Sequence, residues 1–216
     1  MSSVSVVIPC LNLESKIAHV ISLCKEDYEV VVVDDGSDDA TGAVAKKAGA
    51  RVVTHRQNMG KGAAMRTGAR AATGDVVVFI DGDLQHDPKD IPRLVEPIDS
   101  RGCDIVIGAR RIAFGRHMPV QRWLSNSITS GLIRLTSRIP VHDSQSGFRA
   151  TRREKFLALD LKSTRYEIET EWLVKAAKDK QRICEVTIGV VYNDSESHFS
   201  VRDVLNFLRI IIFRRR

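Results

Sequence analysis

Two aspartates follow an apolar run in the stretch VVVFIDGDLQHDP, residues 76–88. Only the small residue Gly82 separates Asp81 from Asp83, so both carboxylates can be offered on one side of a turn. Carboxylate oxygens suit hard cations such as Mg²⁺ or Mn²⁺, which keep waters and bridge to substrate phosphates. An isolated D-x-D is commonly a solvated surface turn. Its position at the end of a predicted buried strand favours a metal site that would stabilise a diphosphate leaving group.

Polar residues also follow two other predicted strands. Pro9-Cys10-Leu11-Asn12 comes after the strand that ends at Ile8, and Asp34-Asp35-Gly36-Ser37 comes after the strand that ends at Val33. In a parallel α/β sheet, ligands bind outside the carboxyl ends of the strands. The three clusters are therefore expected to converge on one crevice, where Asp34-Asp35 could contact a base or a ribose.

Two other nucleotide-binding patterns do not fit the sequence. A dinucleotide fold requires G-x-G-x-x-G after the first strand, and this chain has PCLNLE there. NMGKGAA, residues 58–64, lacks the Ser or Thr that a Walker A motif has after its lysine. Its glycines are expected to allow close packing at the start of a helix, and Lys61 remains a candidate for contact with an anion.

The elements that position these residues follow from the hydrophobic pattern. Short β-branched runs alternate with helical segments over the first hundred residues, which predicts an α/β fold with a mostly parallel sheet and helices on both faces. The predicted strands are 4–8, 29–33, 51–54, 75–80 and 104–107, and the predicted helices are 14–24, 38–48, 61–72 and 89–98. Helices near 120–136 and 166–178 and a strand at 182–191 form a C-terminal elaboration of the same domain, residues 1–200.

The composition is that of a soluble globular protein. The 216 residues are 43% hydrophobic and 28% charged, and the net charge of +6 is compatible with an anionic partner. The four cysteines are far apart in the chain, so buried thiols in a reducing compartment are expected rather than disulfides or zinc ligands. No secretory signal is expected at the N-terminus, and no segment reaches the roughly 20 apolar residues of a spanning helix.

The last sixteen residues, VRDVLNFLRIIIFRRR, predict an amphipathic helix over 201–216. Its apolar side chains recur at helical spacing, and its final arginines suit anionic headgroups at a membrane interface. Docking onto the protein's own core or onto a dimer partner is the competing interpretation. A chain cut before a transmembrane segment is another.

Four segments together resemble family 2 glycosyltransferases of the GT-A fold: VIPCLN, VVVDDGSDDAT, NMGKGAAMRTGARAATGDVVVFIDGDLQHDP and DSQSGFRA. More narrowly, they are similar to polyprenyl-phosphate (dolichyl-phosphate) hexose synthases. The resemblance covers nearly the whole chain, and it is much more specific for the family than for the sugar. It implies transfer of a hexose from a UDP- or GDP-linked sugar to a polyprenyl phosphate, with Mg²⁺ or Mn²⁺. It also implies a peripheral, monotopic protein at the cytoplasmic face of a membrane, with a possible homodimer and no nucleic acid partner.

The resemblance also assigns residues by position. The cation would be held by Asp81, Asp83 and Gln85, and the catalytic residues would be Asp83, Arg110 and Arg122. The nucleotide would contact Pro9, Leu11, Asn12, Glu14, Val33, Asp35, Lys61, Asp81 and Gly82. The acceptor and the diphosphate would contact Arg110, Arg122, Ser125, Ser146, Arg149 and His198.

The chain departs from the family pattern at two places. Leu13 follows Asn12 where the family has Glu, so Glu14 is the candidate substitute. His198 takes the place of a lysine near the C-terminus, in YNDSESHFS.

The acceptor determines what the mechanism needs. A sugar hydroxyl requires a general base, whereas a phosphate monoester with a second pKa of about 6 is already mostly dianionic at neutral pH. Such an acceptor needs positioning and charge neutralisation, for which one or two of the arginines between 110 and 122 are suited. Two alternatives stay open: a family 2 enzyme with a soluble or glycan acceptor, and a nucleotide-binding module without transfer activity.

Overall fold

The computed structural model describes residues 2–110, 120–137 and 141–189. Within these residues one sheet of seven strands runs in the order β3-β2-β1-β4-β6-β5-β7. β6 is antiparallel to both of its neighbours, and the other pairs are parallel. The strands are β1 (Val4–Cys10), β2 (Glu29–Asp34), β3 (Arg51–Thr54), β4 (Val76–Phe79), β5 (Ile105–Arg110), β6 (Arg149–Arg152) and β7 (Ile183–Ile188).

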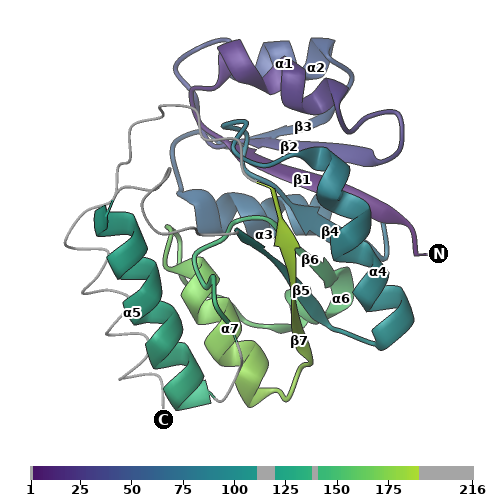
Figure 1. Ribbon diagram of the computed structural model, residues 1–216. Helices are drawn as coiled ribbons and strands as arrows, with labels where there is room; N and C mark the ends of the chain where they lie inside the picture. Colours follow the sequence, from purple (N-terminus) through teal and green to yellow (C-terminus); the bar gives the residue numbers. More distant parts are fainter. Residues whose placement is uncertain (1, 111–119, 138–140, 190–216) are drawn as a thin grey trace.

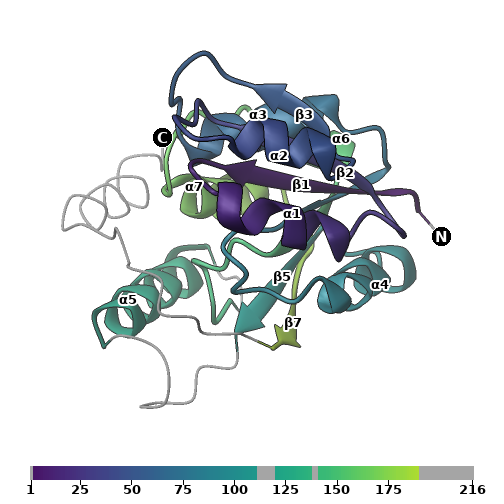
Figure 2. The same cartoon turned by 90° about the horizontal axis from the view of Figure 1, so that it is seen from above.

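Helices cover both faces of this sheet (Figures 1 and 2). Alternate residues of the central strands enter two separate cores, because successive strand side chains point to opposite faces. One core contains buried side chains of α1, α2 and α4, and the other contains those of α3, α5, α6 and α7. The helices are α1 (Glu14–Ser22), α2 (Thr41–Lys47), α3 (Lys61–Ala71), α4 (Ile91–Arg101), α5 (Val120–Ser137), α6 (Arg153–Ala158) and α7 (Ile168–Lys178), and a 3₁₀ turn at Pro88–Asp90 precedes α4.

The glycines around the start of α3 permit close packing, as the sequence predicts. Gly60 has a φ of 90°, and a Cβ there would lie 2.3 Å from the carbonyl oxygen of Thr164. A Cβ at Gly62 would lie 2.4 Å from the carbonyl oxygen of Ser163. The segment that leads into α7 is therefore packed directly against the first turn of α3. This contact fixes the position of Lys61, the first residue of that helix.

The predicted elements of the first hundred residues are all present, with ends shifted by at most a few residues. The hydrophobic pattern did not predict β6 and α6, which follow one another at Arg149–Ala158. The burial of Arg149 and Thr151 in β6 explains the omission, because a strand with buried polar side chains lacks the apolar pattern. The C-terminal segment is therefore an integral part of the sheet, to which it contributes β6 and β7.

The expectation that no cysteines form a disulfide is wrong. Cys103 and Cys184 are bonded, with their Cα atoms 6.2 Å apart and a separation of 81 positions in the chain. The parallel pairing of β5 with β7 brings them together, because Cys184 lies opposite Val106 in the register. Cys10 and Cys24 are buried free thiols, as predicted.

No helix in the described parts of the chain is both long enough and apolar enough to cross a membrane. Residues 201–216 lie outside the described residues, so the amphipathic helix and its separation from residues 1–200 stay predictions.

Candidate active site

The three polar clusters predicted to converge do so at the carboxyl edge of the sheet. β2, β1 and β4 are adjacent and parallel, with Cys10 opposite Asp34 in the register. The loops after β1 and β2 interlock: the amide of Asn12 donates to Ser37 Oγ at 2.9 Å, and the amide of Asp38 donates to Asn12 Oδ1 at 2.9 Å. Asn12 has a φ of 54°, a left-handed conformation that asparagine tolerates better than most residues. Each loop therefore holds the other in place.

The residues predicted to contact the nucleotide differ in how far they reach the surface. Leu11 is 39% exposed, whereas Val33 is fully buried, so a contact of Val33 with the nucleotide stays a prediction. Pro9 is half-buried, and Glu14 is exposed and accepts from the amide of Ala40 at 2.9 Å.

The residue that departs from the family pattern, Leu13, packs against the D-x-D turn. A Cβ on Gly82 would lie 2.8 Å from Leu13 Cδ1, so glycine is the residue that fits between the two aspartates. Leu13 therefore supports the turn by packing, while Glu14 holds the neighbouring loop after β2.

The structure gives Asp35 a role in positioning a loop. Its carboxylate accepts from the amides of Met59 at 3.0 Å and Gly60 at 2.7 Å, and lies 2.6 Å from His55 Nδ1. Asp35 is 4% exposed, and these contacts use both of its oxygens. It therefore anchors the backbone just before Lys61, and its contact with a base or ribose stays a prediction.

Lys61 lies between two carboxylates at the centre of the site. Its Nζ is 2.7 Å from Asp81 Oδ1 and 2.8 Å from Glu169 Oε1. Burial alone would lower the pKa of Lys61, but the two carboxylates raise it above its usual range, so the side chain is a cation at neutral pH. Burial would likewise raise the pKa of Asp81, but Lys61 holds it below its usual value.

The pKa of Asp83 is shifted in the opposite direction from that of Asp81. Burial and the neighbouring charge of Asp81 raise its pKa, although the amide of Gln85 donates to its Oδ1 at 3.0 Å. Two carboxylates that repel each other at a strand end suit a divalent cation, which would relieve this repulsion. The described residues contain no ready-made group of three or more His, Cys, Asp or Glu ligands. Such a group is not required, because Mg²⁺ usually takes one or two carboxylates and completes its shell with water and substrate phosphates.

The DSQSGFRA segment packs directly onto the acidic pair. A Cβ on Gly147 would lie 2.4 Å from Asp81 Oδ2 and 2.8 Å from Lys61 Nζ. Residues 141–148 reach this position because β6, which follows them, is antiparallel to β4. The absence of a side chain at Gly147 therefore leaves room for the ion pair.

His86 lies beside the same site and was not among the predicted residues. It is 6% exposed, its ring is 5.2 Å from that of Phe148, and burial lowers its pKa to about 4. Its Nδ1 is buried without a hydrogen-bond partner among the described residues. His86 is thus a neutral polar group at neutral pH, and its place in DLQHDP was the available sequence signal.

Arg110 lies at the carboxyl end of β5, on the same edge of the sheet as the acidic pair. Its Nε and one terminal nitrogen donate to the two oxygens of Asp143 at 2.7 and 2.9 Å. Burial would raise the pKa of Asp143, but Arg110 lowers it, so the carboxylate stays ionised. This bidentate pair fixes the plane of the Arg110 guanidinium.

Ser146 and Arg149 are placed differently from the expectation that they line the acceptor end. Arg149 is fully buried and donates to the carbonyl oxygens of Ser144, Ser146 and Glu169 at 2.6–3.0 Å. Its guanidinium lies 5.3 Å from the ring of Trp172, and burial lowers its pKa to about 10. Ser146 is also fully buried and donates to the carbonyl oxygen of Gly108 at 2.7 Å. Both side chains therefore support the DSQSG loop from inside the protein, because a buried cation in a sheet strand needs carbonyl acceptors around it.

Three predicted residues have no described side-chain position. Arg122 and Ser125 lie in the first half of α5, and their contacts with the acceptor and diphosphate stay predictions. His198 lies outside the described residues.

Glu169 is a site residue that the sequence analysis missed. It lies in the first turn of α7 and is 3% exposed. Oε1 contacts Lys61, and Oε2 is buried without a hydrogen-bond partner among the described residues. The available sequence signal was in YEIETEW, where Glu169 and Glu171 lie between Ile168 and Trp172 in one turn of helix. Carboxylates placed next to apolar residues in this way indicate a paired site, because buried carboxylates are rare unless they are paired.

Comparison with known proteins decides the family. Residues 5–159 match the family described as Glycosyl transferase family 2. The chain belongs to this family. An uncharacterised glycosyltransferase of Mycobacterium tuberculosis is 37% identical to this family 2 glycosyltransferase over 87% of this chain and 84% of its own length. A UDP-N-acetylglucosamine–dolichyl-phosphate N-acetylglucosaminyltransferase of Methanococcus voltae is 32% identical over 87% of this chain and 85% of its own length. The dolichol-phosphate mannosyltransferase of Pyrococcus furiosus is 33% identical over 96% of this chain and 62% of its own length.

Solved structures support the fold of this family 2 glycosyltransferase. Glucosyl-3-phosphoglycerate synthase of Mycobacterium tuberculosis, in complex with Mn²⁺, UDP and glucosyl-3-phosphoglycerate, has a TM-score of 0.81. It is 29% identical over 97% of this chain and 80% of that chain. A second complex of the same enzyme contains Mg²⁺ and UDP. These complexes agree with the predicted GT-A fold and with Mg²⁺ or Mn²⁺ as the cofactor.

Proposed function

We propose that this family 2 glycosyltransferase transfers a hexose from a UDP- or GDP-linked sugar to polyprenyl or dolichyl phosphate at the cytoplasmic face of a membrane. The observation that carries the donor half of the proposal is the pair Asp81 and Asp83 at the end of β4, with Lys61 2.7 Å from Asp81. Two relatives whose names specify dolichol- or dolichyl-phosphate transfer support the acceptor half.

The donor would be held through its diphosphate. Asp81, Asp83 and Gln85 would bind the divalent cation, which when bound stabilises the negative charge on the departing nucleoside diphosphate. Lys61 adds a positive charge at the same place. Glu169 Oε2 is buried and unpaired among the described residues, which supports a hydrogen bond from a hydroxyl of the donor sugar.

The acceptor phosphate would attack the anomeric carbon in line, with inversion. It arrives largely deprotonated at neutral pH, since the second pKa of a phosphate monoester is about 6, so no general base is needed. Arg110, held in a fixed plane by Asp143, is suited to orient this phosphate. Arg122, Ser125 and His198 remain proposed contacts of the acceptor.

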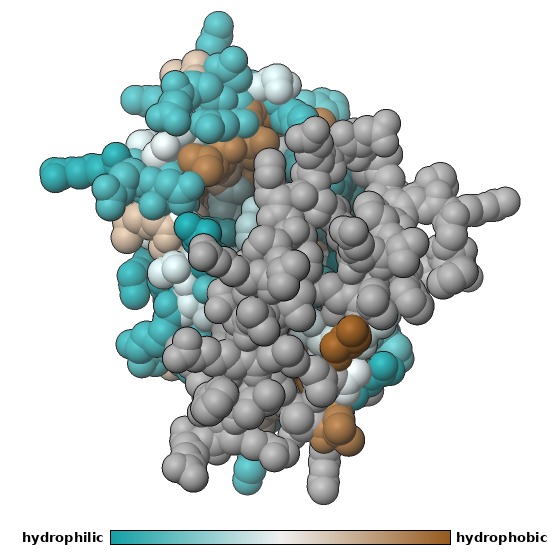
Figure 3. Space-filling model, turned by 90° about the vertical axis from the view of Figure 1, so that its left-hand side faces the viewer, coloured by the Kyte–Doolittle hydropathy of each residue, from teal (hydrophilic) through white to brown (hydrophobic). Residues whose placement is uncertain are grey.

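Apolar residues of α5 support a membrane-facing surface. Ile128 and Leu135 are seven residues apart, so they lie on one side of the helix, and they are 47% and 79% exposed. Figure 3 shows apolar side chains in separate groups among the described residues of this face. Residues 201–216 are proposed to add an interfacial helix. Their deletion should reduce binding to anionic liposomes in a sedimentation assay, and unchanged binding would refute that role.

A soluble phosphorylated acid is the second candidate acceptor. The likeness to glucosyl-3-phosphoglycerate synthase over 97% of this chain favours it. Both candidates carry a phosphate that arginines could bind, but a hydroxyl of 3-phosphoglycerate acting as the nucleophile would also need a general base.

A labelled-donor panel separates these possibilities. UDP- and GDP-linked sugars would be incubated with Mn²⁺ or Mg²⁺ and either a polyprenyl phosphate or 3-phosphoglycerate, and the label would be followed into the organic or aqueous phase. Label in the organic phase that depends on the cation supports the proposal. Transfer only to 3-phosphoglycerate would establish the second candidate. Nucleoside diphosphate binding without transfer to either acceptor would refute both.

A further inference from the structure

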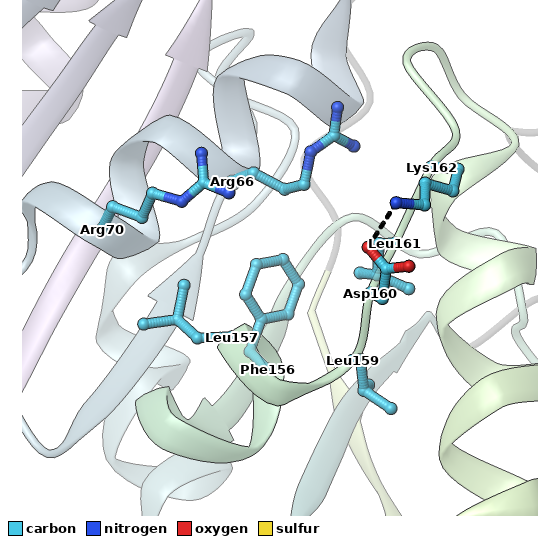
Figure 4. A pocket seen from close by; sticks show the side chains of 8 residues that line it. All are labelled: Arg66, Arg70, Phe156, Leu157, Leu159, Asp160, Leu161 and Lys162. Atoms are coloured by element: carbon cyan, nitrogen blue, oxygen red, sulfur yellow. Dashed lines mark ion pairs between the residues drawn. The ribbon is translucent and has the colours of Figure 1, made fainter.

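A cavity of about 290 Å³ lies between α3 and the segment that follows α6 (Figure 4). The residues that line it are apolar, basic and, at Asp160, acidic. Phe156, Leu157 and Leu159 give it an apolar wall, and Arg66, Arg70 and Lys162 place positive charge around it. Its volume is just below roughly 300 Å³, where the range for small-molecule sites begins.

The positive charge in this cavity exceeds the negative charge that faces it. Arg66 and Arg70 are one turn apart on α3, and neither forms an ion pair with any of the described residues. Arg66 donates to the carbonyl oxygen of Ser163 at 2.6 Å, and burial together with the charge of Arg70 lowers its pKa. The carboxylate that lines the cavity, Asp160, is 2.5 Å from Lys162 Nζ. Two like charges on one helix face therefore repel each other and are available to an anion.

We propose that this cavity binds a small amphiphilic anion, with a phosphate or carboxylate head between Arg66 and Arg70 and a hydrocarbon body against Phe156 and Leu157. Guanidinium groups bind phosphate and carboxylate through paired hydrogen bonds, which favours such a head over a neutral one. The apolar wall favours a hydrocarbon body over a purely ionic ligand, because each buried methylene contributes to binding.

The cavity is a different site from the one around Asp81. Lys61 begins α3 at the carboxyl edge of the sheet, whereas Arg66 and Arg70 follow one and two turns later along the helix. The two sites are connected through the backbone, since Gly62 donates to the carbonyl oxygen of Thr164 at 2.7 Å and Arg66 donates to that of Ser163. The cavity's chemistry does not depend on which acceptor the enzyme uses.

Hexyl phosphate is the probe for this site, and its binding to the full chain can be measured by isothermal titration calorimetry. Inorganic phosphate tests the contribution of the anionic head of the ligand alone, and hexanol tests that of its hydrocarbon body. Arg70→Glu and Leu157→Glu each place a negative charge at the cavity, whereas Lys155→Glu makes the same kind of change at an exposed residue of α6 outside its lining. Circular dichroism and UDP binding in the presence of Mn²⁺ establish that each variant is folded.

Saturable binding of hexyl phosphate is expected, and both cavity variants should weaken it by at least about tenfold. Lys155→Glu should bind as the wild type does, and UDP with Mn²⁺ should not displace the probe. Equal binding by folded Arg70→Glu and Leu157→Glu, displacement by UDP, or equally tight binding of inorganic phosphate would each overturn the proposal. If phosphatidic acid vesicles compete with hexyl phosphate, the natural anion is a lipid headgroup. If they do not compete, it is a soluble metabolite.

Discussion

Gly147→Ala tests the geometry of the acidic site with the smallest possible change. The new Cβ would lie 2.4 Å from Asp81 Oδ2 and 2.8 Å from Lys61 Nζ, and real Cβ atoms essentially never approach another atom closer than 3.0 Å. Gly147 does not have a positive φ, so alanine fits its backbone without strain. The methyl group therefore acts by displacing the carboxylate and the ammonium group.

The expected size of the effect follows from the overlap. Asp81 must move by at least about 0.6 Å to relieve the contact. A misplacement of about 1 Å can reduce a rate on the order of 100-fold, so kcat should fall by about 10- to 100-fold, or about 1.4–2.7 kcal/mol. Overpacking of this kind lowers the free energy of unfolding by about 1–3 kcal/mol, which leaves a domain of ordinary stability folded.

Initial rates of transfer would be measured at increasing Mn²⁺ concentrations for the wild type, Gly147→Ala and Gly131→Ala. A Cβ on Gly131, in α5, meets no atom of the described residues within 4 Å, so this variant is the matched control and should retain its activity. Gly147→Ala should show the lower kcat and a higher half-saturating Mn²⁺ concentration. A folded Gly147→Ala enzyme with a rate within about threefold of the wild type would refute the reasoning that Asp81 must occupy this position.

Three further predictions concern Asp83, Asp143 and the disulfide. Asp83→Asn should abolish metal-dependent transfer and raise the melting temperature without ligands, because a raised pKa means that the ionised carboxylate destabilises the fold at neutral pH; an unchanged or lower melting temperature would contradict this. Asp143→Asn should lower the free energy of unfolding by about 3–5 kcal/mol at pH 7, because Arg110 loses its buried partner. Since the pKa of Asp143 is lowered in the folded protein, that stabilisation is present above about pH 4 and is lost as the pH falls through the folded pKa. The difference in free energy of unfolding between the wild type and Asp143→Asn, measured by urea unfolding, should therefore become smaller in acid. A difference that stays constant with pH would exclude this linkage. Reduction of the bond between Cys103 and Cys184, which closes a separation of 81 residues, should cost about 2–4 kcal/mol, and the melting temperature of the double Ser variant should not respond to reductant; a wild-type melting temperature insensitive to reductant would show that the bond contributes nothing.

Local patterns were sufficient to predict much of the site. Asp81 and Asp83 were identifiable because a β-branched run ends directly before them, and a parallel sheet gathers its strand ends at one edge. Arg110 was identified only through the family resemblance, because the predicted strand ended at Ile107, whereas β5 extends to Arg110. In each case the evidence lay within a few residues of the functional group.

The roles of other residues depend on partners distant in the chain. Glu169 lies 108 positions after Lys61, and nothing in the sequence near either residue specifies their 2.8 Å contact. Arg149 matched a motif whose expected place was the acceptor end, yet the strand β6 turns it into the interior against Trp172. Such assignments require the packing of α7 against the sheet to be known.

The sequence by itself determined the alternation of strands and helices, the acidic turn after β4 and membership of a glycosyltransferase family, because these depend on local periodicity and on contiguous motifs. The tertiary structure alone decided which charges are paired, which motif residues are buried, and that Cys103 lies against Cys184. The physical reason is that burial and ion pairing arise from contacts between segments remote in the chain, such as the insertion of antiparallel β6 between β4 and β5. That insertion places Gly147 against Asp81 and so completes the site.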